Sequence, residues 1–308
     1  MKVFVAGATG VVGRPLVERL LAAGHDVTGM TRSPERAGVL RAAGAQSALA
    51  DAYDPEAVRA AVAAAQPEVV VDQLTDLPAT FPTSRKGLRT AYGANDRIRL
   101  EGCANVLAAA RAAHARRYVS QSIAFFAAPG DEPADEGVPL AVDAPDPIGS
   151  SVRAIDALER RVLGTSDLEA VVLRYGQFYG PGTWFAPGSD IAELVRRRRY
   201  PLMGDGSAAG VFVHLDDAVD ATVAAIDTPA TGLFHVCADE CPPARDWLPA
   251  YAAALGAPPP RRVPKWLVRL AAGDAAVWFG TAVRPARNAR ARAEIGFAPR
   301  PLPGGAPV

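Results

Sequence analysis

The chain of 308 residues is poor in cysteine, has no excess charge of either sign and contains no apolar run long enough to cross a membrane. Its 33 basic and 33 acidic residues cancel, which argues against the basic footprint of a nucleic-acid-binding protein and against a polybasic membrane patch. Charged residues interrupt every apolar segment. We therefore expect neither nucleic acid nor a membrane as a partner.

Cysteine occurs only at Cys103, Cys237 and Cys241. A small and odd number in a chain of this size argues against a disulfide framework and predicts a reducing, cytoplasmic location. Cys237 and Cys241 are close in sequence, but no further ligands accompany them, so we interpret them as ordinary thiols and predict no metal site.

Apolar segments that alternate with helical patterns predict the fold. Strands are expected at 2–7, 25–32, 45–51, 68–75, 116–126, 168–175 and 232–237, with helices between them, among them 14–24, 34–44, 54–67, 95–115 and 146–164. Because the strands are almost continuously apolar, both faces of the sheet should be covered. We predict an α/β fold, a Rossmann-type doubly wound parallel sheet of about seven strands with a smaller C-terminal substrate lobe.

The domain division follows from where this regularity ends. We predict a dinucleotide-binding domain at 1–177, completed by about 211–237, and a substrate lobe made from 178–210 and 238–308. The last seventy or so residues are less regular and rich in proline, tryptophan and arginine, so substrate identity is the hardest property to predict.

The segment "GATGVVG" places three glycines directly after a predicted strand and at the start of a predicted helix. Such spacing allows a tight turn, a close approach of the backbone to a diphosphate, and close packing of helix on strand. The alternative is a glycine-rich turn without a ligand. We predict a nucleotide-binding loop that comprises Gly7, Thr9, Gly10, Val11, Val12 and Gly13.

The end of the second strand should face the adenosine ribose. A carboxylate there would bind the 2′-hydroxyl, but the sequence has Thr31, Arg32, Ser33 and Arg36, which suit a 2′-phosphate. We therefore favour NADP(H) over NAD(H); in the alternative, Arg32 stacks on adenine or faces water. Asp51 is placed to accept a bond from the adenine amino group. The other cofactor contacts that we predict at strand ends are Ala52, Gln73, Leu74 and Thr75.

Seven motifs occur in one order along the chain: "GATGVVG", "LADAYD", "RYVSQSIAFF", "LRYGQFYGPGT", "PLMGDG", "FVHLDDAVDA" and "ARNARARAEIGFAP". On these motifs the chain resembles the extended and atypical short-chain dehydrogenase/reductases, the NAD(P)-dependent epimerase/dehydratase family, over nearly its whole length. The resemblance implies a seven-stranded parallel sheet with a C-terminal substrate lobe. It also implies a monomer or a homodimer, since the family is often dimeric.

The resemblance further implies a Tyr-x-x-x-Lys pair on the helix at 146–164, yet that segment contains neither residue type. In the family the lysine binds the nicotinamide ribose and lowers the pKa of the tyrosine, which moves the proton that accompanies hydride transfer. Glu159 matches the glutamate that usually follows the lysine, which places Ile155 at the lysine position and Ser151 at the tyrosine position. Only Lys2, Lys86 and Lys265 are lysines; Lys86, in the predicted loop after the fourth strand, fits better as a solvated lysine than as a replacement.

Other side chains are left to carry the chemistry. Ser122 matches the family's active-site serine; in the alternative it is a strand-end serine bonded to the backbone. Tyr175 and Tyr179 are candidates to donate a proton to a developing oxyanion, with packing as the alternative for Tyr179. Gln121 and Gln177 are predicted substrate contacts.

Two further groups resemble catalytic arrangements but are interpreted as structural. His214 and Asp216 precede a helix that Asp217 should start, so we predict packing and capping. Asp135 and Glu136 lie in an acidic loop and are expected in solvent, although loop closure would bring them towards the site.

Three functions remain open. The first is an NADP(H)-dependent reductase that acts on a small oxygenated substrate, sugar-like or a secondary metabolite, with a non-standard proton donor. The second is a non-redox epimerase, dehydratase or cyclase that retains the nucleotide. The third is a non-enzymatic NADP(H) sensor.

Overall fold

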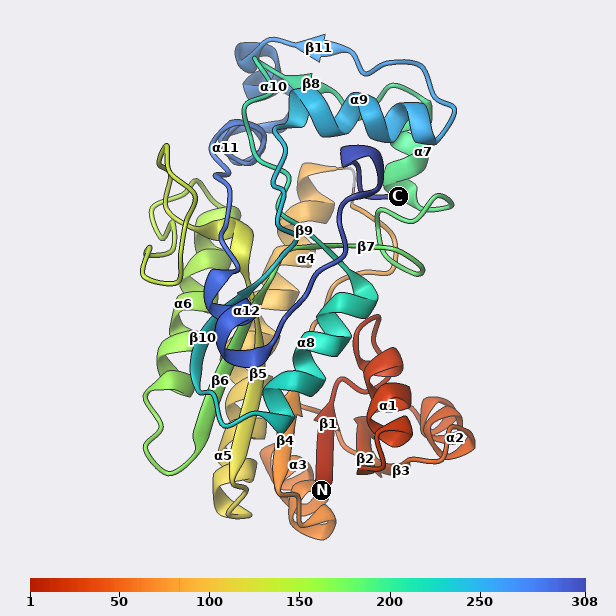
Figure 1. The fold of residues 1–308 in the computed structure, drawn as a ribbon, viewed down its shortest axis with the longest axis vertical. Coiled ribbons are helices and arrows are strands. Elements are labelled where there is room, and N and C mark those ends of the chain that lie inside the picture. The colour runs from red at the N-terminus through yellow and green to blue at the C-terminus, as the bar shows by residue number, and fades with distance from the viewer. Residues whose placement is uncertain (83) are drawn as a thin grey trace.

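Seven short apolar strands form one parallel sheet in the computed structural model, which describes residues 1–82 and 84–308 (Figure 1). The strand order is β10-β6-β5-β4-β1-β2-β3. The strands are β1 Lys2–Ala6, β2 Asp26–Thr31, β3 Gln46–Leu49, β4 Val69–Asp72, β5 Arg117–Ile123, β6 Glu169–Tyr175 and β10 Gly232–Val236. The sequence prediction of a doubly wound parallel sheet is confirmed.

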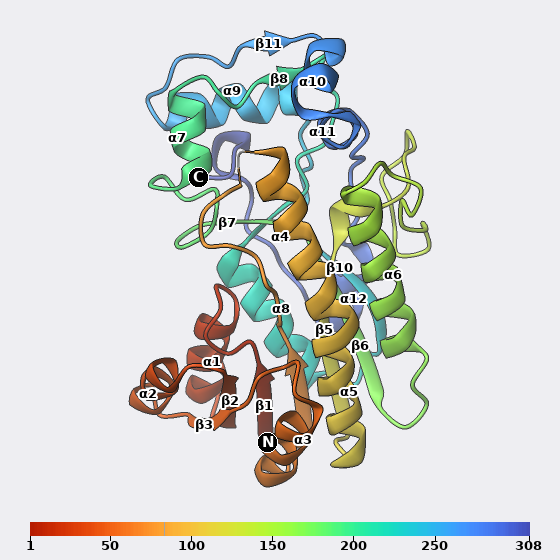
Figure 2. The same cartoon turned by 180° about the vertical axis from the view of Figure 1, so that it is seen from behind.

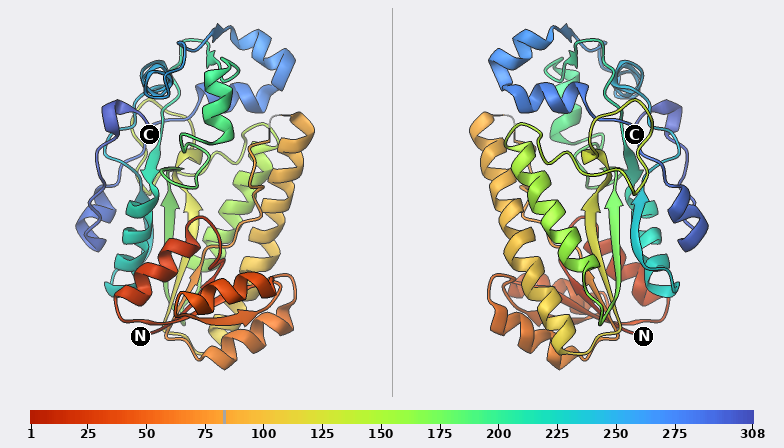
Figure 3. Two further views of the ribbon diagram at one scale, coloured as in Figure 1. Left: turned by 90° about the vertical axis from the view of Figure 1, so that its right-hand side faces the viewer. Right: turned by 90° about the vertical axis from the view of Figure 1, so that its left-hand side faces the viewer.

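Successive side chains of each strand point to opposite faces of the sheet, so a hydrophobic core forms on each face. Val3 and Val5 of β1 face one core, whereas Phe4 faces the other. Figures 1 and 2 show the two helical layers, and Figure 3 shows the sheet between them. The first core is covered by α1 Gly13–Ala22, α2 Pro34–Ala42 and α8 Leu215–Asp227, and the second by α3 Pro55–Ala65, α5 Cys103–Ala112 and α6 Ile148–Leu163.

One helix begins earlier than the sequence suggested. The structure has α4 at Arg85–Arg97, a π-helical turn η1 at Ile98–Gly102, and then α5, where we predicted a single helix from residue 95. Ser84 caps α4 by accepting a hydrogen bond from the Gly87 amide at 3.0 Å. Lys86 therefore lies in the first turn of a helix, and its placement in a loop was wrong. Two glycines and few apolar residues conceal the helical pattern.

The remaining elements gather beyond the carboxyl ends of the strands, from the middle to the top of Figure 1. They are η2 Ala124–Phe126, β7 Gln177–Tyr179, α7 Asp190–Arg196, β8 Leu202–Met203, β9 Phe212–His214, α9 Ala244–Ala254, β11 Arg262–Val263, α10 Lys265–Ala272, α11 Asp274–Thr281 and η3 Pro303–Gly305. In contrast, α12 Ala289–Ile295 packs through Ala291 and Ile295 into the sheet core beside α8. The predicted boundaries of the two domains remain predictions.

Candidate nucleotide-binding and catalytic site

The loop between β1 and α1 has two positions that require glycine. Gly7 has a φ of +78°, and a Cβ there would lie 2.5 Å from the carbonyl oxygen of Gln73. A Cβ on Gly13 would overlap the carbonyl oxygen of Gly7 and the Cα of Ala8. Because backbone fills both spaces, the helix start is held close to the ends of β1 and β4.

The start of α1 has the properties of an anion-binding site. No side chain among the described residues caps it, and its first turn contains no acidic residue. Gly10 donates to the Gly7 carbonyl at 3.0 Å, which closes the turn, while Val11 is half exposed. Uncapped N–H groups and the helix dipole favour a diphosphate here. The loop predicted from the sequence therefore fits the diphosphate of a dinucleotide.

Two exposed cations flank the end of β2. Thr31 is buried and accepts from the Ser33 amide at 3.2 Å, and Ser33 caps α2 by accepting from the Arg36 amide at 3.3 Å. The Arg32 side chain is 70% exposed, and its nearest described carboxylate is that of Asp76, at 4.0 Å. These guanidinium groups and hydroxyls fit a 2′-phosphate.

The adenine side is simpler. Asp51 is exposed, and its Oδ1 accepts from the Tyr53 amide at 3.0 Å. Ala52 is buried, and its carbonyl accepts from the Asn105 side chain at 2.9 Å. Among the described residues, no hydrogen bond involves the second carboxylate oxygen of Asp51, and its role towards adenine stays a prediction.

Three elements hold the loop that follows β4. Asp72 is buried and accepts from the Leu74 amide at 3.0 Å, while the Gln121 side chain donates to the Leu74 carbonyl at 2.6 Å. Asn95 of α4 is buried and accepts from the Asp76 amide at 3.0 Å. Sequence reasoning did not single out Asn95, because it placed Asn95 at the start of a helix and not near the end of α4. Thr75 is exposed in this loop.

Tyr175 links this loop to α8. Its hydroxyl accepts from the Gln73 side chain at 3.1 Å and lies 2.7 Å from the Thr222 hydroxyl. Burial raises the pKa of Tyr175 to about 12. The Oε1 atom of Gln73 is buried and has no hydrogen-bond donor among the described residues. The proton-donor role of Tyr175 stays a prediction; its hydroxyl is engaged on the α8 side of the sheet.

Ser122 is bonded to a buried ion pair instead of the backbone. Its hydroxyl donates to Glu159 Oε1 at 2.5 Å. Glu159 accepts two further bonds from Arg174, at 2.7 and 2.6 Å. Arg174 also lies 3.4 Å from the His235 ring, and burial followed by the Arg174 charge lowers the pKa of His235 to about 4. Glu159 of α6 thus links this helix to Ser122 of β5 and to Arg174 of β6.

The two positions that the resemblance assigns to tyrosine and lysine have different surroundings. Ile155 is buried among apolar side chains. Ser151 is buried, donates to Asp96 Oδ1 at 2.5 Å and accepts from Arg99 Nη1 at 3.3 Å. Lys86 is exposed at the far end of α4. A buried arginine, which sequence reasoning missed, therefore lies beside the residue in the tyrosine position.

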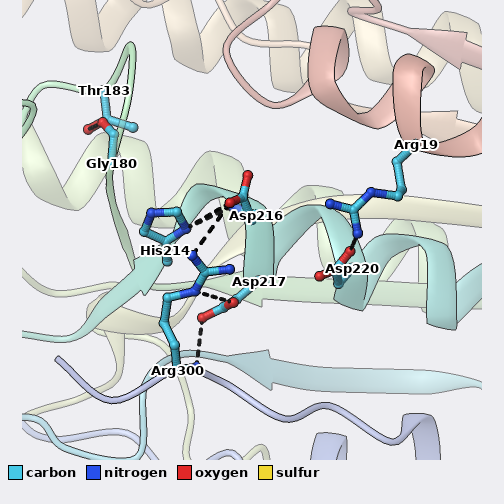
Figure 4. A network of polar contacts seen from close by, with 8 residues as sticks. All are labelled: Arg19, Gly180, Thr183, His214, Asp216, Asp217, Asp220 and Arg300. Carbon is cyan, nitrogen blue, oxygen red and sulfur yellow. Dashed lines mark hydrogen bonds and ion pairs between the residues drawn. The ribbon is translucent and has the colours of Figure 1, made fainter. Parts of the chain in front are cut away.

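His214 and its neighbours form the start of α8 (Figure 4). His214 Nδ1 accepts from the Asp216 amide at 3.1 Å, and Arg300 pairs with Asp217 at 2.8 Å. Burial lowers the pKa of His214. The prediction of a capping and packing element is confirmed, but the helix begins at Leu215 with His214 as its cap, so the prediction that Asp217 starts it was wrong.

Tyr179 is fully buried with its ring 5.0 Å from that of His214, and its hydroxyl has no partner among the residues described. Burial raises the pKa of Tyr179 to about 12. Gln177 is half-buried in β7, where its backbone N–H donates to the Val211 carbonyl at 2.7 Å.

The acidic loop is tied to the sheet at one point. Glu136 Oε1 accepts from the His235 amide at 2.9 Å, so the expectation that Glu136 lies free in solvent was wrong. Asp135 accepts from the Gly137 amide at 3.0 Å and does not contact the sheet residues discussed above.

Over the described part of the chain, no helix has the length and apolar content that a bilayer crossing needs. Within residues 1–82 and 84–308, no three histidine, cysteine or acidic side chains are grouped as metal ligands.

The nucleotide loop, the strand order and the residues at the strand ends agree with one family of enzymes. Residues 3–236 match the model of the NAD dependent epimerase/dehydratase family. The chain belongs to this family. Its members bind NAD(P), so the protein is an NAD(P)-dependent enzyme of the oxidoreductase or epimerase/dehydratase type.

Relatives of known name include both reductases and epimerases. A Streptomyces protein named 3-diazoavenalumate denitrifying reductase is 48% identical over 305 residues, which cover 97% of this chain and 96% of that protein. The 2-alkyl-3-oxoalkanoate reductase of Stenotrophomonas maltophilia is 31% identical over 84% of this chain and 77% of its own length. The UDP-glucose 4-epimerase of Thermus thermophilus, solved with NAD, is 25% identical with a TM-score of 0.72 and covers 97% of this chain and 94% of that one.

Proposed function

We propose that this family member is an NADP(H)-dependent reductase that removes a diazo group from a carboxylate substrate and leaves hydrogen in its place. The Streptomyces relative, named as a denitrifying reductase of a diazo carboxylate, supports this reaction class because the likeness spans 97% of the chain. The site beside Ser151 supports it independently.

The observation that carries the proposal is the absence of tyrosine and lysine from α6, where Ser151 and Ile155 are buried instead. Reduction of a ketone needs a proton for the alkoxide as well as a hydride. Reduction of an aryldiazonium needs only the hydride: a C–H bond forms, the C–N bond breaks, and its electron pair leaves with dinitrogen. A reductase of this kind needs no proton donor, so it can do without the tyrosine and without a lysine that lowers the tyrosine's pKa.

Each part of the cofactor has residues that fit it. Gly7 to Gly13 would hold the diphosphate, and Asp51 the adenine. Thr31, Arg32, Ser33 and Arg36 would hold a 2′-phosphate, which supports NADP(H) over NAD(H). When bound, NADP(H) supplies the hydride.

The remaining predicted residues take positioning roles in this proposal. Ser122 commits its proton to Glu159, so its oxygen is left to accept. Tyr175 orients Gln73, whose second amide atom is unpaired among the described residues. Tyr179 packs on His214. Gln121 fixes the Leu74 carbonyl, and Gln177 is the proposed substrate contact.

An aromatic surface beside α6 supports a flat substrate. Phe125 packs edge-on against Phe126 and Phe279, with ring centroids 4.9 and 6.1 Å apart. Trp278 and Tyr92 join the same cluster, and four of these five residues are only partly buried. Aromatic rings attract a planar conjugated substrate through offset or edge-on contacts.

The test is to incubate the protein with NADPH and 4-carboxybenzenediazonium. We expect NADPH oxidation above the rate without protein, release of dinitrogen, and deuterium at the former diazo carbon when the transferred hydride is deuterium. Consumption of NADPH without dinitrogen release, or a rate equal to the protein-free control, would sink the proposal. A 3-oxoalkanoate offered in parallel tests the ketone alternative, which should react poorly.

A further inference from the structure

Within residues 1–82 and 84–308, Arg99 is a buried cation that pairs with no carboxylate. It lies in the π-helical turn η1 between α4 and α5 and is only 5% exposed. Among the described residues its guanidinium forms no ion pair within 4.0 Å, and its one side-chain hydrogen bond is the 3.3 Å contact to Ser151. By contrast, Arg174, equally buried, makes two short bonds to Glu159.

Burying the Arg99 guanidinium without a carboxylate destabilises the protein unless an anion binds to it. A guanidinium has five N–H donors and stays charged in proteins, and an unpaired buried charge is destabilising. Burial lowers the pKa of Arg99, and Asp96 opposes this only partly from beyond ion-pair distance. Ser151 donates to Asp96 Oδ1, and the Ser150 hydroxyl, which also contacts the Pro147 carbonyl at 2.9 Å, lies 3.1 Å from Asp96 Oδ2, so both carboxylate oxygens already have hydroxyl neighbours. The donor capacity of Arg99 is therefore left for another anion.

The position of Arg99 indicates which anion. Its hydrogen-bond partner Ser151 occupies the position that the resemblance assigns to the tyrosine. Tyr92 is close enough for the Arg99 charge to act on its hydroxyl, and Tyr92 belongs to the aromatic cluster with Phe125 and Trp278. A buried cation near one ring of this aromatic cluster fits a flat molecule that carries a negative oxygen group. Irregular π-helical turns such as η1 often occur where a helix supports a functional side chain.

We propose that Arg99 binds the carboxylate of the substrate and so selects aromatic or conjugated acids over neutral analogues. The choice of a carboxylate acid as substrate rests on the proposed function; the free guanidinium at the site does not. Bidentate pairing with a carboxylate would satisfy the unused donors and orient the ring against Phe125 and Trp278.

The experiment measures binding by calorimetry, with the protein saturated with NADP+. Cinnamate and cinnamamide serve as probes because they differ only in the charged group. Wild-type protein should bind cinnamate roughly ten- to a hundredfold more tightly, as expected for a charge-assisted bond. Arg99→Gln should bring the two affinities together. Arg97→Gln is the control, since Arg97 lies on α4, is exposed and pairs with Glu101.

Each variant is checked for NADP(H) binding and melting temperature. If Arg99→Gln does not fold, Arg99→Met gives the same comparison, because its apolar stem fills similar space without the charge. An unchanged preference for cinnamate in the folded variant would overturn the proposal, as would a wild-type protein that does not distinguish the probes. A failed diazonium assay with intact cinnamate selectivity would instead contradict only the reaction.

Discussion

At the scale of single residues, the side chains at the end of β2 make few hydrogen bonds and ion pairs with the protein, whereas those around Tyr175 make several. Arg32 and Arg36 are exposed, and Arg32 has only a 4.0 Å contact with Asp76. Tyr175, in contrast, is buried and its hydroxyl is hydrogen-bonded to Gln73 and Thr222. Free polar groups at a strand end are expected to meet a ligand. The cofactor preference should therefore depend on individual side chains.

The double variant Arg32→Gln, Arg36→Gln should raise the Kd for NADPH by roughly tenfold or more, because two charge-assisted contacts to the 2′-phosphate are lost. The Kd for NADH should barely change, since NADH has no phosphate there. Fluorescence titration of both cofactors measures the ratio. Arg59→Gln, an exposed arginine of α3, is the control. Equal losses for the two cofactors would rule out a 2′-phosphate site.

His235 should make stability depend on pH. Its pKa is lowered from 6.5 to about 4 by burial and by Arg174, so the folded protein resists protonation at pH values where the unfolded chain accepts it. The contribution is fully present above pH 6.5 and is lost as the pH falls towards 4, by up to about 3 kcal/mol. Urea unfolding across this range measures it. His235→Asn should flatten the dependence, while His114→Asn should leave it as in wild type; an equally steep curve in both would contradict the assignment.

At the scale of helices and strands, sequence patterns predicted the parallel sheet because its strands are short, apolar and bounded by turn residues. The same patterns missed α4, whose glycines and charges hide a buried side formed by Ala91 and Asn95. The C-terminal helices were also missed, because short helices that bury few residues, such as α10 and α11, show little periodicity.

Within the candidate site, too, some features could be predicted from the sequence and others could not. The phosphate loop is local in sequence, so spacing alone predicts it. The partners of Ser122 and Ser151 come from distant segments, and no local pattern reveals that Glu159 reaches Ser122 or that Arg99 reaches Ser151. Contacts of this kind depend on how helices pack, which a single sequence does not specify.

The stability of the protein should depend on Glu159, which joins α6 to β5 and β6. Glu159→Gln leaves the Arg174 charge buried without a carboxylate, which should lower the free energy of unfolding by about 3–5 kcal/mol. Glu193→Gln breaks an exposed pair with Arg197 and should cost less than about 1 kcal/mol. Chemical denaturation compares the two. Similar small losses would mean that the buried pair contributes no more than a surface contact.

At the scale of the whole molecule, the chain keeps the family's nucleotide-binding type of fold, while α6 lacks the tyrosine and lysine that the resemblance implies for proton transfer. The proposed reaction makes this omission testable, because hydride transfer to a diazonium consumes no proton. Single-turnover reduction of 4-carboxybenzenediazonium should slow when the transferred hydrogen of NADPH is deuterium. It should change by less than about twofold in D2O, or about 0.4 kcal/mol in the barrier.

Variants of the candidate donors sharpen this test. Tyr175→Phe and Ser122→Ala should keep the single-turnover rate within about tenfold of wild type, since a general acid is worth at least about a hundredfold where one is needed. Rapid-mixing absorbance of the reduced nicotinamide measures each rate. A marked slowing in D2O that disappears in Tyr175→Phe would identify Tyr175 as a true proton donor. A proton would then move in the rate-limiting step, which contradicts the proposed proton-free hydride transfer, and the loss of tyrosine and lysine from α6 would need a different explanation.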